Sequence, residues 1–112
     1  MMGIDGNVWA TIQTYTTDKN ATGEQVQIWK DAQRIWGWLD LASGSSGYSS
    51  YNAKIQESTH LFIADYVPLL PGIEAEKVRM IVKGKAYDVM LIDNPMELNE
   101  QLEFYLKYTG GQ

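Results

Sequence analysis

The chain has 112 residues, 45% of them hydrophobic, and no cysteine. This predicts one domain spanning residues 1–112 and excludes disulfides, thiolate zinc sites and cysteine nucleophiles. The formal net charge is -5 and the nine Lys and Arg residues are scattered, so the basic stripe typical of duplex-binding proteins is missing. We also find no secretion signal and no stretch near the roughly 20 apolar residues that cross a bilayer, and therefore expect an unsecreted protein without membrane contact.

The first third of the chain alternates with a period of two, which is typical of strands. In residues 8–13 the apolar Val8, Ala10 and Ile12 alternate with other residues, and residues 25–28 repeat the pattern. Both runs predict a strand with one buried face. Residues 17–24 between them are rich in turn-forming residues, which predicts a hairpin loop.

The alternation resumes at residues 34–41. Ile35, Gly37 and Leu39 fall on one face there, and Trp36 and Trp38 fall on the other. The following residues, 42–56, are rich in glycine and serine. They predict a long mobile loop, because few apolar groups are present to offset the entropy lost on ordering.

The second half of the chain predicts three more stretches of sheet. Residues 59–67 form an apolar and aromatic run that ends before Pro68, as expected for a buried strand. Residues 78–82 and 86–91 flank Lys83-Gly84-Lys85, which predicts a tight hairpin with glycine at a positive φ. Residues 100–108 alternate as in a strand but also carry leucines at helical spacing, and we interpret them as a strand.

Together these elements predict an all-β fold of about five or six strands. We expect a small antiparallel β-barrel or sandwich, with the long flexible loop between strands two and three. The expected core residues are Ile63, Val89, Leu91 and Phe104.

Catalytic chemistry finds little support in the sequence. A Ser/His/Asp set would have to use His60, the only histidine, with Ser58 and Asp65. In a strand Asp65 lies on the face opposite the other two, so triad geometry is not expected. Calcium-loop and zinc spacings and the glycine-rich phosphate motif are also missing. We therefore expect no enzyme activity, no metal and no cofactor.

The tryptophans are the most informative side chains. Four occur in this short chain, and Trp29, Trp36 and Trp38 cluster within ten positions. One small core cannot hold all of them. Either they cap the barrel, or some form an interface with a partner, where Trp and Tyr are enriched.

Five stretches are informative through their order along the chain. They are V-W-A-T-I-Q-T-Y at residues 8–15, I-W-G-W-L-D-L-A-S-G at 35–44, Y-N-A-K-I-Q-E-S-T-H-L-F-I-A-D-Y at 51–66, G-K-A-Y-D-V-M-L-I-D-N-P-M at 84–96 and L-E-F-Y-L-K-Y at 102–108. In this order they resemble the phage head-tail joining (head-closure) family. Each piece is weak alone, but together they are distributed over nearly the whole chain, from residue 8 to residue 108.

The resemblance implies a structural subunit of a tailed bacteriophage. Such proteins form a homo-oligomeric ring under the portal or an adaptor ring, close the DNA-filled head and dock the tail proteins. The chain would thus be made in the bacterial host cytoplasm and reside in the virion, with packaged DNA passing nearby without sequence-specific binding. The long loop would act in the channel or in assembly through Ser43, Gly44, Gly47, Tyr48, Tyr51, Lys54, Ile55 and Glu57.

A generic β-barrel binding module is the alternative. In that case Trp9, Tyr15, Trp36 and Trp38 would form a face for a peptide or for single-stranded nucleic acid. The sequence offers no basic face for the latter ligand.

Overall fold

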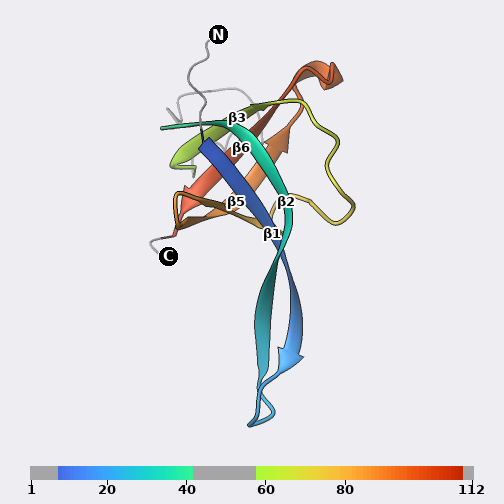
Figure 1. The fold of residues 1–112 in the computed structure, drawn as a ribbon, viewed down its shortest axis with the longest axis vertical. Coiled ribbons are helices and arrows are strands. Elements are labelled where there is room, and N and C mark those ends of the chain that lie inside the picture. The colour runs from blue at the N-terminus through green and yellow to red at the C-terminus, as the bar shows by residue number, and fades with distance from the viewer. Residues whose placement is uncertain (1–7, 42–57, 110–112) are drawn as a thin grey trace.

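The computed structural model describes residues 8–41 and 58–109 (Figure 1). Apart from one short 3-10 turn, η1 (Pro95–Glu97), all regular structure in these residues is β. The strands are β1 (Val8–Lys19), β2 (Gln25–Leu41), β3 (His60–Asp65), β4 (Arg79–Val82), β5 (Lys85–Asp93) and β6 (Gln101–Tyr108). The predicted all-β fold is confirmed, including a strand rather than a helix in the last segment.

The six strands close into an antiparallel barrel rather than a sandwich. Their order around the barrel is β1-β2-β3-β6-β5-β4. The pairing of Ala10 on β1 with Val82 on β4 closes the ring of strands. The segment 42–57 connects β2 to β3, where the long loop was expected, and lies outside the described residues.

The core fills the barrel with inward side chains from every strand. Phe62 on β3 and Phe104 on β6 are fully buried, and their ring centroids lie 6.3 Å apart in an edge-to-face arrangement. Val89 is also fully buried. The predictions that Phe104 and Val89 belong to the core are therefore confirmed.

Two of the four predicted core residues were assigned to the wrong face. Ile63 lies between the inward-facing Phe62 and Ala64, so its side chain is on the outer side of β3. The register of β5 with β6 shifts between Val89 and Leu91. This β-bulge adds one residue to the strand and moves Leu91 off the inward face.

Gly37 allows β2 and β3 to approach closely. It pairs with Ala64 and is buried. A Cβ at this position would overlap the backbone oxygen of Ile63. The glycine is therefore required by close backbone contact, because its own φ is not positive.

The hairpin predicted at Lys83-Gly84-Lys85 is confirmed, although Lys85 already belongs to β5. Val82 pairs with Lys85, which leaves a two-residue turn, and Lys83 and Gly84 have φ angles of 53° and 78°. Positive φ at both central positions is the feature of the type I′ turn, whose twist matches that of the flanking strands.

Beyond the barrel, β1 and β2 continue as a two-stranded projection (Figure 1), here called the arm (residues 14–30). The arm makes the molecule elongated, with extents of 49 × 28 × 25 Å. Its turn is tied by Asn20, whose Oδ1 accepts hydrogen bonds from the amides of Thr22 and Glu24, both at 3.0 Å. The hairpin predicted here is confirmed. Its first strand runs further than expected, to Lys19, and its second strand begins at Gln25, as expected.

The arm also corrects one expectation. Val26 and Ile28 were expected on a buried face, yet they are 37% and 39% exposed. Among the described strands, only β1 pairs with this part of β2, because β3 pairs with residues 37–41. The alternating side chains of residues 25–28 therefore have no barrel core to pack against.

Candidate interaction surfaces

The first candidate surface lies on the outer wall of the barrel. Trp9 on β1 and Trp36 on β2 are directly opposite each other in the ladder, and their ring centroids lie 5.1 Å apart in an edge-to-face contact. The Arg34 guanidinium lies 4.5 Å from the Trp9 ring centroid. Both tryptophans are 48% exposed. These three residues, called the tryptophan patch, combine apolar area with one positive charge.

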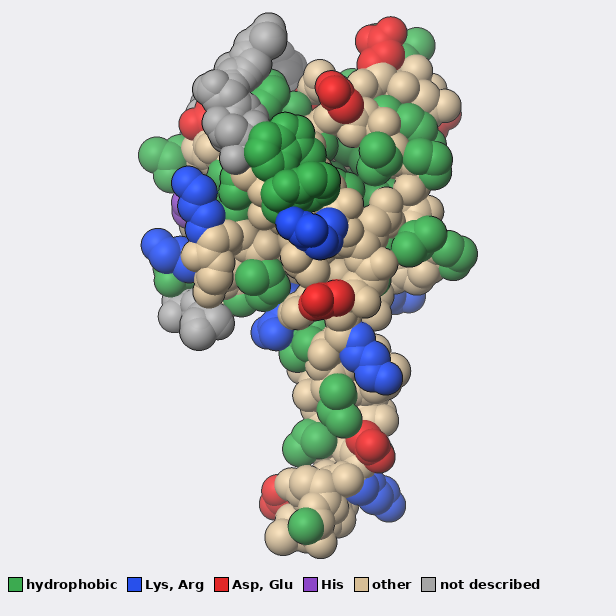
Figure 2. Space-filling view, in the orientation of Figure 1, with side chains coloured by type: hydrophobic (Ala, Val, Ile, Leu, Met, Phe, Trp, Pro, Cys, Tyr) green, Lys and Arg blue, Asp and Glu red, His purple; other side chains and the backbone are tan. Residues whose placement is uncertain are grey.

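The space-filling view shows this combination. Figure 2 shows a group of hydrophobic side chains with a basic side chain below it, on the face of the barrel formed by β1 and β2. Edge-to-face aromatic pairs with a cation on one ring are well ordered at low entropic cost, which suits a contact surface.

The three tryptophans singled out from the sequence do not form one cluster. Trp36 belongs to the tryptophan patch, while Trp38 is half-buried farther along the outer side of β2, opposite Ile63 on β3. Trp29 lies on the arm, opposite Tyr15. The sequence did not identify Trp9 as the partner of Trp36, because that pairing depends on the β1–β2 register.

Trp29 and Tyr15 fasten the arm to the barrel. Their ring centroids lie 5.0 Å apart, and the Arg79 guanidinium lies 4.3 Å from the Trp29 ring centroid. Arg79 Nε also donates a hydrogen bond of 2.7 Å to Gln13 Oε1, and Gln13 Nε2 donates one of 2.8 Å to Asp31 Oδ1. These contacts of Tyr15, Trp29, Arg79, Gln13 and Asp31, here called the clamp, connect the arm to the barrel. They set the direction in which the arm leaves the barrel.

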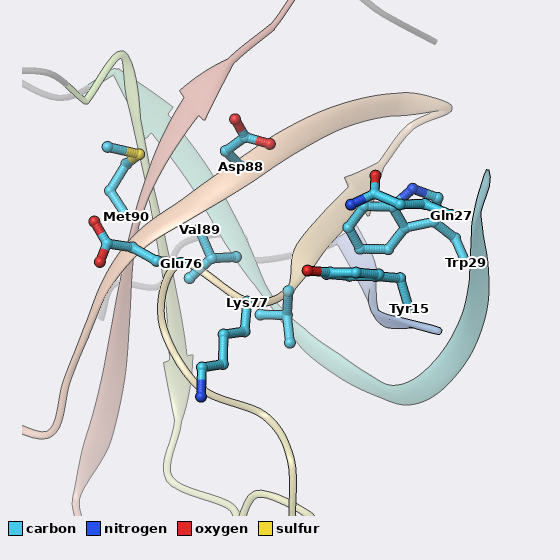
Figure 3. A pocket seen from close by; sticks show the side chains of 9 residues that line it. Tyr15, Gln27, Trp29, Glu76, Lys77, Asp88, Val89 and Met90 are labelled. Atoms are coloured by element: carbon cyan, nitrogen blue, oxygen red, sulfur yellow. The ribbon is translucent and has the colours of Figure 1, made fainter. Parts of the chain in front are cut away.

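A cavity of about 320 Å³ lies beside the clamp (Figure 3). The arm contributes the Tyr15 and Trp29 rings on one side, and β5 with the segment before β4 contributes the other. Glu76, at the rim, has a φ of 69°, and its amide donates a 2.8 Å hydrogen bond to the Val89 carbonyl. The described residues that line the cavity include the carboxylates of Glu76 and Asp88 and the amine of Lys77, but no histidine, serine or cysteine.

His60 belongs to a separate aromatic cluster at the start of β3. Its ring lies 5.0 Å from that of Tyr87, which in turn lies 5.4 Å from Tyr108. Burial lowers the pKa of His60 below its ordinary value of 6.5, and Lys85 lowers it further. Burial also raises the pKa of Tyr87, and Tyr108 adds to the rise.

The polar partner of His60 is a neighbouring hydroxyl group. His60 Nδ1 lies 2.8 Å from the Thr59 hydroxyl oxygen, and Asp65 is at the opposite end of β3. Within residues 8–41 and 58–109, no group of three or more His, Cys, Asp or Glu side chains could hold a metal ion. No helix in the described part of the chain is long and apolar enough to cross a membrane.

The predicted loop site lies outside the described residues. This applies to all eight of its members, Ser43, Gly44, Gly47, Tyr48, Tyr51, Lys54, Ile55 and Glu57.

The fold of this chain is similar to that of other solved proteins. Protein SF1141 from Shigella flexneri 2a is 21% identical, with 95% of each chain covered and a TM-score of 0.66. A chain in the virion of a native gene transfer agent particle is 11% identical, with 89% of this chain and 91% of that chain covered and a TM-score of 0.57. At these identities the likeness shows a shared fold. No family model and no curated protein sequence matches the chain.

Proposed function

We propose that this chain is a non-enzymatic structural subunit of a tailed-bacteriophage head-tail connector. It would assemble as a ring under the portal or an adaptor ring, close the DNA-filled head and dock the tail. The observation that carries the proposal is the fold, which is shared over 89% of the chain with a protein of a gene transfer agent virion. The ordered resemblance to head-closure proteins supports the same role.

The arm supports assembly with other subunits. A two-stranded hairpin without a third strand is marginally stable in water. The arm nevertheless carries Val26 and Ile28 in exposed positions. Contact with a neighbouring subunit would bury these side chains. The arm would then serve as a contact between subunits.

The charge suits a passage for DNA. With a formal net charge of -5, the subunit would repel the phosphate backbone rather than bind it. A ring of such subunits would let packaged DNA pass without sequence-specific contact.

Electron microscopy of a reconstituted complex tests this proposal. The purified chain would be mixed with portal rings from the same genome, and a small acidic β-barrel protein of unrelated origin would serve as the control. We expect a collar of stoichiometric density under the portal in the mixture with this chain, and no collar in the mixture with the control protein. A correctly folded chain that leaves the portal bare, with and without an adaptor ring, would refute the proposal.

The tryptophan patch favours one other candidate, a binding module for a peptide or for single-stranded nucleic acid. Trp9, Trp36 and Arg34 would then stack on ligand groups. The patch is smaller than the sequence suggested, because Tyr15 pairs with Trp29 on the arm and Trp38 is half-buried. Saturable quenching of tryptophan fluorescence by single-stranded oligonucleotides, lost in Trp36→Ala, would favour this alternative.

A further inference from the structure

One side of the arm continues the inward side of the barrel. Thr14 and Thr16 follow Ala10 and Ile12 at two-residue spacing along β1, and Thr16 lies opposite Ile28 on β2. The inward pattern thus runs past the end of the barrel and into solvent. We call this side the arm face: it consists of Thr14, Thr16, Val26 and Ile28, with Lys30 opposite Thr14 at its base and Asp18 opposite Val26 at its tip.

The opposite side of the arm is held against the barrel. Tyr15 packs on Trp29 there (Figure 3), and the Arg79 guanidinium lies over the Trp29 ring. The arm therefore projects at a fixed angle and presents β-branched side chains, which lose little rotamer freedom on packing. Preorganisation of this kind lowers the entropic cost of association.

We propose that the arm face packs against the tryptophan patch of a second copy of this chain. The two surfaces differ in shape, since one is a projecting ribbon and the other lies on the barrel wall. Contact between two different surfaces of one chain is heterologous, and repeated around an axis it produces a ring. The proposal rests on the ring assembly proposed above, and it names the subunit contact that would build the ring.

Charge favours this pairing. The tip of the arm face carries the carboxylate of Asp18, and the tryptophan patch carries the guanidinium of Arg34. Lys30 lies at the other end of the arm face, opposite Thr14, so the charge at the tip is negative. An Arg–carboxylate contact beside an apolar contact fixes the register of an interface. The remaining surfaces, two β-branched apolar side chains and two half-exposed tryptophans, provide the area that the contact buries.

The arm also has sufficient reach. From Thr14 to Lys19 it spans about 20 Å at roughly 3.3 Å per residue. The shorter extents of the molecule are 28 and 25 Å, so one arm can cross most of a neighbouring barrel.

Disulfide trapping tests the contact, and the absence of native cysteine makes single-cysteine variants clean probes. Thr16→Cys places the thiol on the arm face, and Thr11→Cys places it opposite Arg34, next to the tryptophan patch. Thr17→Cys is the matched control, because it is the same residue type, is also exposed and lies on the other side of β1. The variants would be mixed in pairs and mildly oxidised, alone at high concentration and with portal rings.

We expect the Thr16→Cys and Thr11→Cys mixture to give about tenfold more mixed disulfide than the Thr17→Cys and Thr11→Cys mixture, because docking raises the effective thiol concentration. Equal yields would overturn the proposal. So would a dominant disulfide between two Thr16→Cys chains, since it would indicate two-fold pairing of arms. Absence of the mixed disulfide in both conditions would also overturn it.

A reciprocal charge exchange gives an independent readout. Asp18→Arg and Arg34→Asp should each reduce self-association measured by analytical ultracentrifugation, and the double variant should recover most of it. Failure of the double variant to recover, with unchanged thermal stability, would contradict direct contact. Trapping without a collar under the portal would reject the connector function while leaving the subunit contact in place.

Discussion

The strands β1 and β2 run through both the barrel and the arm, but their alternating side chains are buried in the barrel and exposed in the arm. In the barrel β1 pairs with β2 on one side and with β4 on the other, and its alternate side chains are buried completely. In the arm the two strands pair with each other alone, and the same alternation leaves Val26 and Ile28 exposed. Alternation therefore specifies which side chains share a face. Whether that face is buried depends on whether further strands complete the barrel around it.

The largest contrast is expected from truncating one apolar side chain in each region. Phe104→Ala should lower the free energy of unfolding by about 3–5 kcal/mol, because the ring is fully buried against Phe62. Ile28→Ala on the arm should cost less than about 1 kcal/mol. Urea denaturation would measure both. Similar losses for the two variants would show that the arm belongs to the cooperative core.

A second contrast concerns two glycines. Gly37→Ala should cost about 1–3 kcal/mol or more, because the added methyl group forces β2 away from the Ile63 carbonyl. Gly23→Ala in the arm turn meets open space, and its cost of about 1 kcal/mol comes from the positive φ alone. In thermal unfolding, Gly37→Ala should lower the melting temperature more than Gly23→Ala does. The main effect of Gly23→Ala should be faster amide exchange near the turn of the arm. A full-size loss from Gly23→Ala would contradict the independence of the arm.

A third change loosens the connection between the two regions. Arg79→Met removes the cation–π contact with Trp29 and the hydrogen bond to Gln13, and should cost about 1–2 kcal/mol. We expect increased motion of arm amides in nuclear magnetic resonance relaxation, with little change in the barrel. Arg34→Met removes the equivalent contact with Trp9 and serves as the control. Arm amides that stay as rigid as before would show that the clamp is not what orders the arm.

The smallest effect concerns pH and is confined to the barrel. The pKa of His60 is lowered in the folded state by burial and Lys85, so the unfolded chain binds its proton more readily. The contribution to stability is complete above the unfolded value of 6.5 and is lost as the pH falls toward and below the folded pKa. His60→Gln should flatten this part of the stability profile between pH 7 and 5. An identical profile in the variant would exclude His60 as its source.

The sequence predicted what depends on neighbouring residues. Lys83-Gly84 identified its hairpin because the turn chemistry is local, and the closing strand was recognised from the alternation that places Leu102, Phe104 and Leu106 inside. Ile63 was misplaced because residues 61–64 are apolar throughout, so their pattern does not reveal which side faces inward.

The surfaces were harder to predict than the fold. Ile12 pairs with Gln33 while Gln13 pairs with Asp31, so Ala32 is an extra residue in β2. This one-residue bulge sets which aromatic residue of β1 meets which tryptophan of β2. No local pattern marks it, and the pairing of Trp9 with Trp36 therefore emerged from the three-dimensional structure alone.

The closure of the barrel has a consequence for solubility. Strands within it have neighbours on both sides, so their backbone amides and carbonyls offer no template to another chain. In the described residues of the arm, each strand pairs on one side alone, which leaves two edges open to water. Charged side chains along the arm, such as Asp18, Lys19 and Lys30, oppose strand addition there. Aggregation of the folded subunit should thus begin at the arm edges, and occupation of the arm by a neighbour would protect the protein from it.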